Sequence, residues 1–306
     1  MSTTFQISPD EVHRALDDLD PVELVVAELT GKKAPERSFV VGPEAGLGVG
    51  LAEKYLVVEE PSSATRFLLP LGALQAVRGA CLASAAARVF VPPGAATVSV
   101  LGSGISAELL LRMAVRYVVD VSHVAVCAVG GSVEEIVTNR VIDELDLSGI
   151  SLAVTSEIAE AIFGANLVGI AGKSAVNIKI DQIARGAVLV NCSGWDLPAS
   201  VVDGVATVYV DNLGLIEENL HRYFVGVHRS SESGPAARRR QEYHSHRIAG
   251  DLRGLLSGDH IVRAEPEGIV LVEMLGVDTL STSLACQLML AAHRLGLGNV
   301  IQDSAP

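Results

Sequence analysis

The sequence predicts an α/β protein with a doubly wound parallel sheet and a second, smaller α+β domain. Apolar, strand-like runs alternate with helical stretches, and these runs are nearly continuously apolar, as parallel strands buried on both faces are. The connections are long enough for crossovers. With 306 residues, 49% of them hydrophobic, the chain exceeds the usual size of one core, so we expect two domains. The candidate strands are 97–101, 123–129, 151–155, 167–171, 187–192, 206–210 and 269–274.

The N-terminal part of the chain begins with helical sequence. Residues 6–30 predict one helix or two, opening on a capping signal: Ser8 caps, Pro9 suits the first turn, and Glu11 occupies the third position after the cap. Strand-like runs then follow between residues 51 and 71.

A proline pair marks the predicted domain boundary. An Ala-rich helix over residues 73–90 is expected to end at Pro92-Pro93-Gly94. We therefore predict one domain from residue 94 to about 280. Residues 1–93, joined by about 281–306 with a C-terminal helix from Thr282 to Leu295, form the other.

Composition argues against two classes of partner. A net charge of −13 and an aromatic content of 4% would repel a nucleic acid and offer it few stacking rings. No apolar run reaches the length of a membrane span, and the N-terminus lacks the basic and apolar segments of an export signal. We expect a cytoplasmic protein without membrane or nucleic-acid partners, whose four widely spaced cysteines are reduced.

A glycine motif directly follows the strand candidate 97–101. Gly102 permits a tight turn, Gly104 lets a pyrophosphate approach bare backbone, and the small Ala107 lets the next helix pack close to its strand. The motif predicts a dinucleotide pocket on a Rossmann-type sheet; the alternative is a tight turn that binds no nucleotide. The cofactor-binding candidates here are Gly102, Ser103, Gly104, Ile105 and Ala107.

The second strand ends differently from an NAD-selective pocket. Such a pocket presents Asp or Glu to the ribose 2′-hydroxyl, whereas this strand ends in Gly130-Gly131-Ser132, which we include among the cofactor-binding candidates. The cofactor is therefore NAD or NADP, with a preference for NADP or a weakened site.

Several segments, taken in order, resemble the ornithine cyclodeaminase and μ-crystallin family of nicotinamide-dependent enzymes. They are Leu74–Ala87, Ser156–Val168, Gly186–Asp196, and Leu275-Gly276-Val277-Asp278 through Gly298. The resemblance implies hydride transfer at the α-carbon of an amino or imino acid, by cyclodeaminase, ketimine reductase or amino-acid dehydrogenase chemistry. It also implies a homodimer, and a substrate-binding and dimerisation role for the smaller domain, with the active site in the cleft between the domains.

The resemblance assigns roles to individual residues. Asp196 becomes the acid-base residue, the alternative being a cap of the next helix. Arg78 becomes the anchor for a substrate carboxylate, with an internal salt bridge as the alternative. Lys54 is either a second cation for the substrate or a solvated lysine. The nicotinamide end is assigned to Gly172, Lys173, Asn191, Ser193 and Gly194, with a simple loop lysine as the alternative for Lys173. The single tryptophan, Trp195, walls the pocket or fills the core.

The chain also departs from the family pattern. Residues 31–70 are shortened, which puts the substrate side in doubt, and Gly79 replaces an expected threonine. The segment 238–247 is rich in Arg and His but lacks a closed ligand set, so we predict no metal and a solvated helix face. These departures favour, as the alternative, an NAD(P)-binding protein with little or no catalysis.

Overall fold

The computed structural model describes residues 3–32, 40–43, 54–60, 65–94, 96–172, 174–232, 248–261, 267–276 and 279–301. The chain divides into two compact units, Gly79–Val277 and Met1–Arg78 with Asp278–Pro306. The division falls inside helix α3 (Leu71–Phe90), upstream of the proline pair that follows this helix. The functional roles of the two units stay a prediction.

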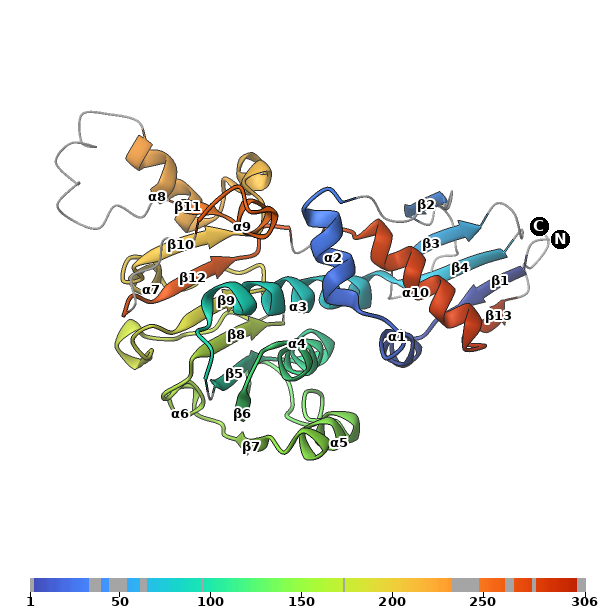
Figure 1. Cartoon of the computed structure of the whole chain (residues 1–306), viewed down its shortest axis with the longest axis horizontal. Coiled ribbons are helices and arrows are strands. Elements are labelled where there is room, and N and C mark those ends of the chain that lie inside the picture. The colour runs from blue at the N-terminus through green and yellow to red at the C-terminus, as the bar shows by residue number, and fades with distance from the viewer. Residues whose placement is uncertain are drawn as a thin grey trace. The chain divides into compact units, whose positions relative to one another are not determined.

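The larger unit is built on an eight-stranded sheet, parallel in every pairing (Figure 1). Its strand order, β11-β10-β12-β9-β8-β5-β6-β7, confirms the predicted doubly wound sheet. All seven predicted strands are present within two residues at each end. The strand β11 was missed because Ile-Ala-Gly-Asp carries almost no apolar run. The strands are β5 (Ala96–Gly102), β6 (Val121–Ala128), β7 (Ser151–Val154), β8 (Leu167–Ala171), β9 (Val188–Asn191), β10 (Thr207–Val210), β11 (Ile248–Asp251) and β12 (Val270–Glu273).

The chain changes winding direction between two neighbouring strands of this sheet. From β5 it runs outward through β6 and β7, and it then returns to β8 on the other side of β5. The carboxyl ends of β5 and β8 therefore flank the switch point, where open parallel sheets bind their ligands.

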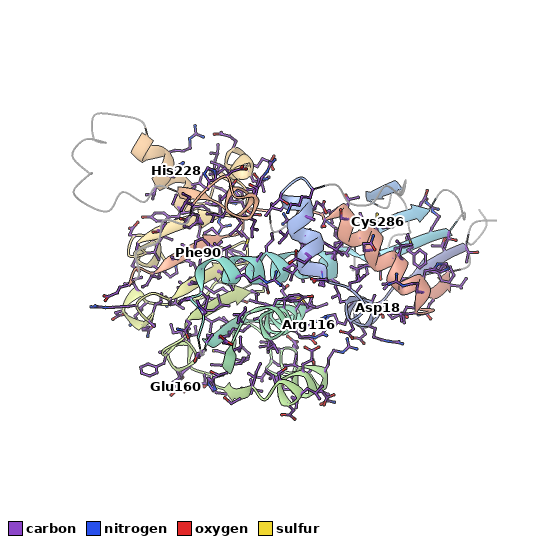
Figure 2. All side chains as sticks on the ribbon, viewed as in Figure 1. Asp18, Phe90, Arg116, Glu160, His228 and Cys286 are labelled. Atoms are coloured by element: carbon purple, nitrogen blue, oxygen red, sulfur yellow. The ribbon has the colours of Figure 1, made fainter. Side chains whose placement is uncertain are left out.

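Helices connect these strands. They are α4 (Gly104–Tyr117), α5 (Asn139–Ser148), α6 (Ile158–Ala161), α7 (Ala199–Val202), α8 (Tyr223–Glu232) and α9 (Leu252–Ser257), with 3-10 turns at Ile180–Gln182 and Leu213–Asn219. The end of α3 packs on the sheet through Phe90, labelled in Figure 2, whose ring centroid lies 4.7 Å from that of Tyr209. Among the described residues, no helix has the length and apolarity needed to cross a bilayer.

The smaller unit is α+β, as expected. Its five-stranded mixed sheet has the order β13-β1-β4-β3-β2, with β1 and β4 parallel and the other neighbours antiparallel. Helix α10 lies over β3 and β4 and packs against α1 and α2 (Figure 1). The elements are β1 (Thr3–Gln6), β2 (Val40–Pro43), β3 (Tyr55–Glu60), β4 (Thr65–Pro70), β13 (Asn299–Ile301), α1 (Pro9–Leu16), α2 (Pro21–Leu29) and α10 (Thr282–Arg294).

The predicted capping box is present at the start of α1. The Ser8 hydroxyl accepts the Glu11 backbone N–H at 3.3 Å, and a Glu11 carboxylate oxygen accepts the Ser8 backbone N–H at 2.9 Å. Asp20 caps α2 through the Glu23 backbone N–H at 3.2 Å, so the helical stretch of 6–30 forms two helices and not one.

Helix α10 is capped by a residue from a distant part of the chain. The Glu28 carboxylate on α2 accepts the Thr282 and Ser283 backbone N–H groups, each at 3.1 Å, and the Ser281 hydroxyl. The Glu28 carboxylate complements the positive end of the α10 dipole. One turn further along α10, burial raises the pKa of the free thiol of Cys286 to about 11, and the Glu28 charge acts in the same direction to a lesser extent.

Replacing Glu28 tests this long-range cap. We expect Glu28→Ala to lower the free energy of unfolding by about 1 to 2 kcal/mol, because two helix amides and the helix dipole lose their acceptor. Glu28→Gln keeps one oxygen and should lose less. Urea unfolding followed by circular dichroism measures both, and an Ala variant as stable as wild type would contradict the cap.

Candidate functional site

The glycine motif lies at the switch point of the parallel sheet. A Cβ on Gly102, whose φ is +151°, would stand 1.7 Å from the carbonyl oxygen of Ala171 at the end of β8. The ends of β5 and β8 thus approach so closely that only glycine fits at position 102.

The first turn of α4 starts from this turn with its amides available. Ser103 is the N-cap residue in an extended conformation and makes no side-chain capping bond, and a Cβ on Gly104 would meet nothing within 4 Å. Ile105 is half-buried, and Ala107 is fully buried. A 14-residue helix with uncapped first amides is suited to hold an anion such as a pyrophosphate.

Two further loops converge on Ser103. A Cβ on Gly172, after β8, would lie 2.9 Å from the Ser103 backbone nitrogen and hydroxyl, and a Cβ on Gly131, after β6, would lie 2.6 Å from the Ser103 Cβ. A Cβ on Gly130 would likewise overlap the Ser174 side chain, and Ser132, which follows Gly131, is exposed. This bare-backbone cradle fits a dinucleotide. The structure thus brings most of the predicted cofactor residues together, although their binding role stays a prediction and Lys173 lies outside the described residues.

A second polar cluster occupies the ends of β9 and β12. Asn191 pairs in register with Glu273, and both side chains are completely buried. The Asn191 amide donates to the two Glu273 oxygens at 3.2 and 3.0 Å and to the Trp195 carbonyl at 2.8 Å. Its carbonyl accepts the Ser193 hydroxyl at 2.7 Å and the Ser193 N–H at 3.1 Å. Asn191 therefore shapes the turn that contains Ser193 and Gly194.

Arg222 joins this cluster between two carboxylates. Its side chain is 3% exposed, its Nε donates to Asp196 at 2.8 Å, and its Nη2 donates to Glu273 at 2.7 Å and to the Trp195 carbonyl at 3.1 Å. Arg222 and Glu273 were not predicted, because neither local sequence carries a strong signal of a site. An apolar strand ending in a lone Glu was the only available signal.

Asp196 is the charged member of the cluster nearest to solvent. Its side chain is 38% exposed, one oxygen is held by Arg222, and the other accepts the Tyr223 backbone N–H at 3.2 Å. Asp196 is not the N-cap residue of the next helix, α7, because Pro198 holds that position. It interacts instead with the start of α8, whose first residue is Tyr223. Trp195 is 53% exposed, which contradicts the alternative that it fills the core.

The two predicted substrate cations belong to the smaller unit. Lys54 is exposed just before β3, and Arg78 is buried on α3 with 8% exposure. Gly79, the residue after Arg78, accepts a hydrogen bond from the Cys192 thiol at 3.6 Å through its carbonyl.

No group of three His, Cys, Asp or Glu in the described part of the chain is arranged to hold a metal ion, and segment 238–247 lies outside that part.

Burial gives Glu273 an unusual proton affinity. Desolvation raises the pKa of its carboxyl from the ordinary 4.5 to about 7, and the nearby Asp196 charge acts in the same direction. Arg222 and Asn191 act in the opposite direction by favouring the charged form. Solvent exclusion therefore outweighs the ion pair at this position.

The raised pKa of Glu273 predicts a pH-dependent stability. Between pH 4.5 and about 7 the folded state binds more protons than the unfolded state, so the stability from Glu273 is present below pH 4.5 and is lost as the pH rises through about 7. The free energy of unfolding of wild type, relative to Glu273→Gln, should fall by up to about 3 kcal/mol over this window. Urea unfolding across the window measures it, and a difference that is constant or rises with pH would contradict the shift.

The ion-pair cluster predicts a large cost for removing its cation. Arg222→Met leaves Glu273 buried without a counter-charge and should lower the free energy of unfolding by about 3 to 5 kcal/mol. Arg229→Met on α8 is a matched control, because the ion pair of Arg229 with Glu217 is exposed, and we expect it to cost about 0 to 1 kcal/mol. Adding Glu273→Gln should recover part of the Arg222→Met loss. Equal losses for the two arginine variants would refute the role of the cluster.

Comparisons with known proteins agree with this architecture. No family model and no curated protein sequence matches the chain. Among solved structures, CmnK is 18% identical with a TM-score of 0.69, covering 100% of both chains. The Δ1-pyrroline-2-carboxylate reductase of Thermococcus litoralis is 13% identical with a TM-score of 0.67, covering 97% of this chain and 100% of that one. A probable ornithine cyclodeaminase from Bordetella pertussis Tohama I is 15% identical with a TM-score of 0.65, covering 97% and 99%. The chain therefore has the fold of the ornithine cyclodeaminase and μ-crystallin family, as its sequence motifs indicated.

Proposed function

We propose that the protein is a nicotinamide-dependent oxidoreductase acting on an amino or imino acid. The observation that carries the proposal is the bare-backbone cradle around Ser103, which lies at the switch point of a doubly wound sheet. The fold adds support, because the structurally similar reductase of Thermococcus litoralis is a complex with NADH and L-proline.

The cradle residues would hold the cofactor, which is NAD or NADP. Gly102 to Gly104 and the first amides of α4 suit its pyrophosphate, and Gly131 and Gly172 let their loops pack closely against Ser103. The ends of β8 and β9 are then the nicotinamide half of the site. When bound, the nicotinamide supplies or accepts a hydride at the α-carbon of the substrate.

Asp196 is the proposed acid-base residue near the substrate nitrogen. Its ion pair with Arg222 and its bond to the Tyr223 N–H hold the carboxylate in one orientation. A fixed negative charge stabilises a cationic amine or imine and accepts its proton. Arg78 is the proposed carboxylate anchor, with Lys54 as a second cation. Assembly as a homodimer and a cytoplasmic location remain predictions from the sequence.

Cofactor oxidation tests the proposal. With NADH or NADPH and a panel of cyclic imino acids, or α-keto acids plus amine, we expect a fall in absorbance at 340 nm. Asp196→Asn should reduce kcat by about 100-fold or more, because it removes the proton acceptor while keeping the shape. The exposed Asp181→Asn is the control and should leave the rate unchanged. Turnover that survives in Asp196→Asn would exclude the acid-base role.

A nicotinamide-binding protein without turnover is the second candidate. It is favoured by one observation, since both Asp196 oxygens already accept hydrogen bonds from the protein itself. In that case the same assay gives cofactor binding by calorimetry but no oxidation with any member of the panel. Product analysis of an active enzyme would separate cyclodeaminase, ketimine reductase and amino-acid dehydrogenase chemistry.

A further inference from the structure

An acidic side chain reaches the cradle from a position beyond the end of the second strand. A Cβ placed on Gly131 would lie 2.8 Å from the Glu135 Oε2 atom and 2.6 Å from the Ser103 Cβ. The Glu135 carboxylate therefore occupies the space that a side chain at position 131 would fill, and it does so beside the turn of the glycine motif. Glu135 itself is exposed to solvent.

The backbone around Glu135 is fixed by its neighbours. Ile136 is completely buried, and its N–H donates to the Val133 carbonyl at 2.9 Å. Thr138, the N-cap residue of α5, donates its hydroxyl hydrogen to the Glu108 carboxylate on α4 at 3.0 Å. The loop after β6 is thus tied to the helix that begins at the cradle, which keeps Glu135 close to Ser103.

We propose that Glu135 recognises the adenosine ribose and makes the site selective for NAD over NADP. This inference rests on the proposed nicotinamide cofactor. In dinucleotide sites the loop after the second strand faces this ribose, and an acidic group there accepts hydrogen bonds from its hydroxyls. Here β6 ends at Ala128, and the missing side chain at Gly131 leaves the space in which the Glu135 carboxylate lies.

Electrostatics works against NADP at the same place. The 2′-phosphate of NADP would add its negative charge next to the Glu135 carboxylate, and the two like charges would repel each other. Glu134 is also acidic, but its carboxylate is engaged locally, because hydrogen bonds from its own backbone N–H and from the Ser132 hydroxyl lower its pKa. From the sequence, the doublet Gly130-Gly131 suggested NADP or a weakened site. In this proposal, Glu135 provides the acidic group that the end of β6 lacks.

Calorimetric titration of the full chain with NADH and with NADPH tests the inference without any substrate. We expect wild type to bind NADH at least about 10-fold more tightly than NADPH. Glu135→Gln keeps the size of the side chain and removes its charge, so the ratio of the two dissociation constants should fall towards one. Glu134→Gln is the matched control and should keep the wild-type ratio within about threefold.

The outcomes separate the inference from the proposed function. Equal affinities in wild type, a preference for NADPH, or a ratio that Glu135→Gln leaves unchanged would each overturn the role of Glu135 while leaving a nicotinamide site in place. Binding of neither cofactor by folded wild type would overturn both. Glu135 is exposed, so its variant should keep the wild-type circular dichroism spectrum and remain a valid test.

Discussion

The architecture of the candidate site depends on one close approach inside the parallel sheet. The ends of β5 and β8 meet where position 102 has no side chain, since a Cβ there would overlap the Ala171 carbonyl oxygen. Any larger residue would push β8 away and would move Gly172, which flanks Ser103 on that side. The change of winding direction occurs between the same two strands, so one steric constraint brings together the turn, the amides of α4 and the loops beside them.

A second constraint is electrostatic and acts on the neighbouring strand ends. Two carboxylates, Asp196 and Glu273, share the single guanidinium of Arg222; Asn191 also donates to Glu273, and the Tyr223 N–H donates to Asp196. Because Glu273 is completely buried, its desolvation competes with its ion pair, whereas the partly exposed Asp196 keeps contact with solvent. The cluster thus holds the turn after β9 in one shape and presents a single oriented carboxylate at the sheet edge.

Glycines at the ends of two neighbouring strands, β5 and β6, serve different purposes. At Gly102 the absence of a side chain lets two strands approach each other, whereas at Gly131 it makes room for a carboxylate from another part of the same loop. A glycine doublet at a strand end is therefore ambiguous in sequence. It is typical of a strand end that has no acidic side chain for the ribose. The same residues also accommodate an acidic side chain from four positions further along the chain, as Glu135 does here.

Features that depend on neighbours along the chain follow directly from the order of the residues. These are the capping box of Ser8 and Glu11, the alternation of buried strands with helices, and the tight turn at Gly102, because each follows from local hydrogen bonding, periodicity or backbone freedom. Which charged groups meet, by contrast, depends on the packing of distant segments. Glu28 caps a helix 253 residues away, and Arg222 bridges residues 26 and 51 positions from it on either side. Such contacts are set by how strands and loops pack, which no short segment of sequence specifies.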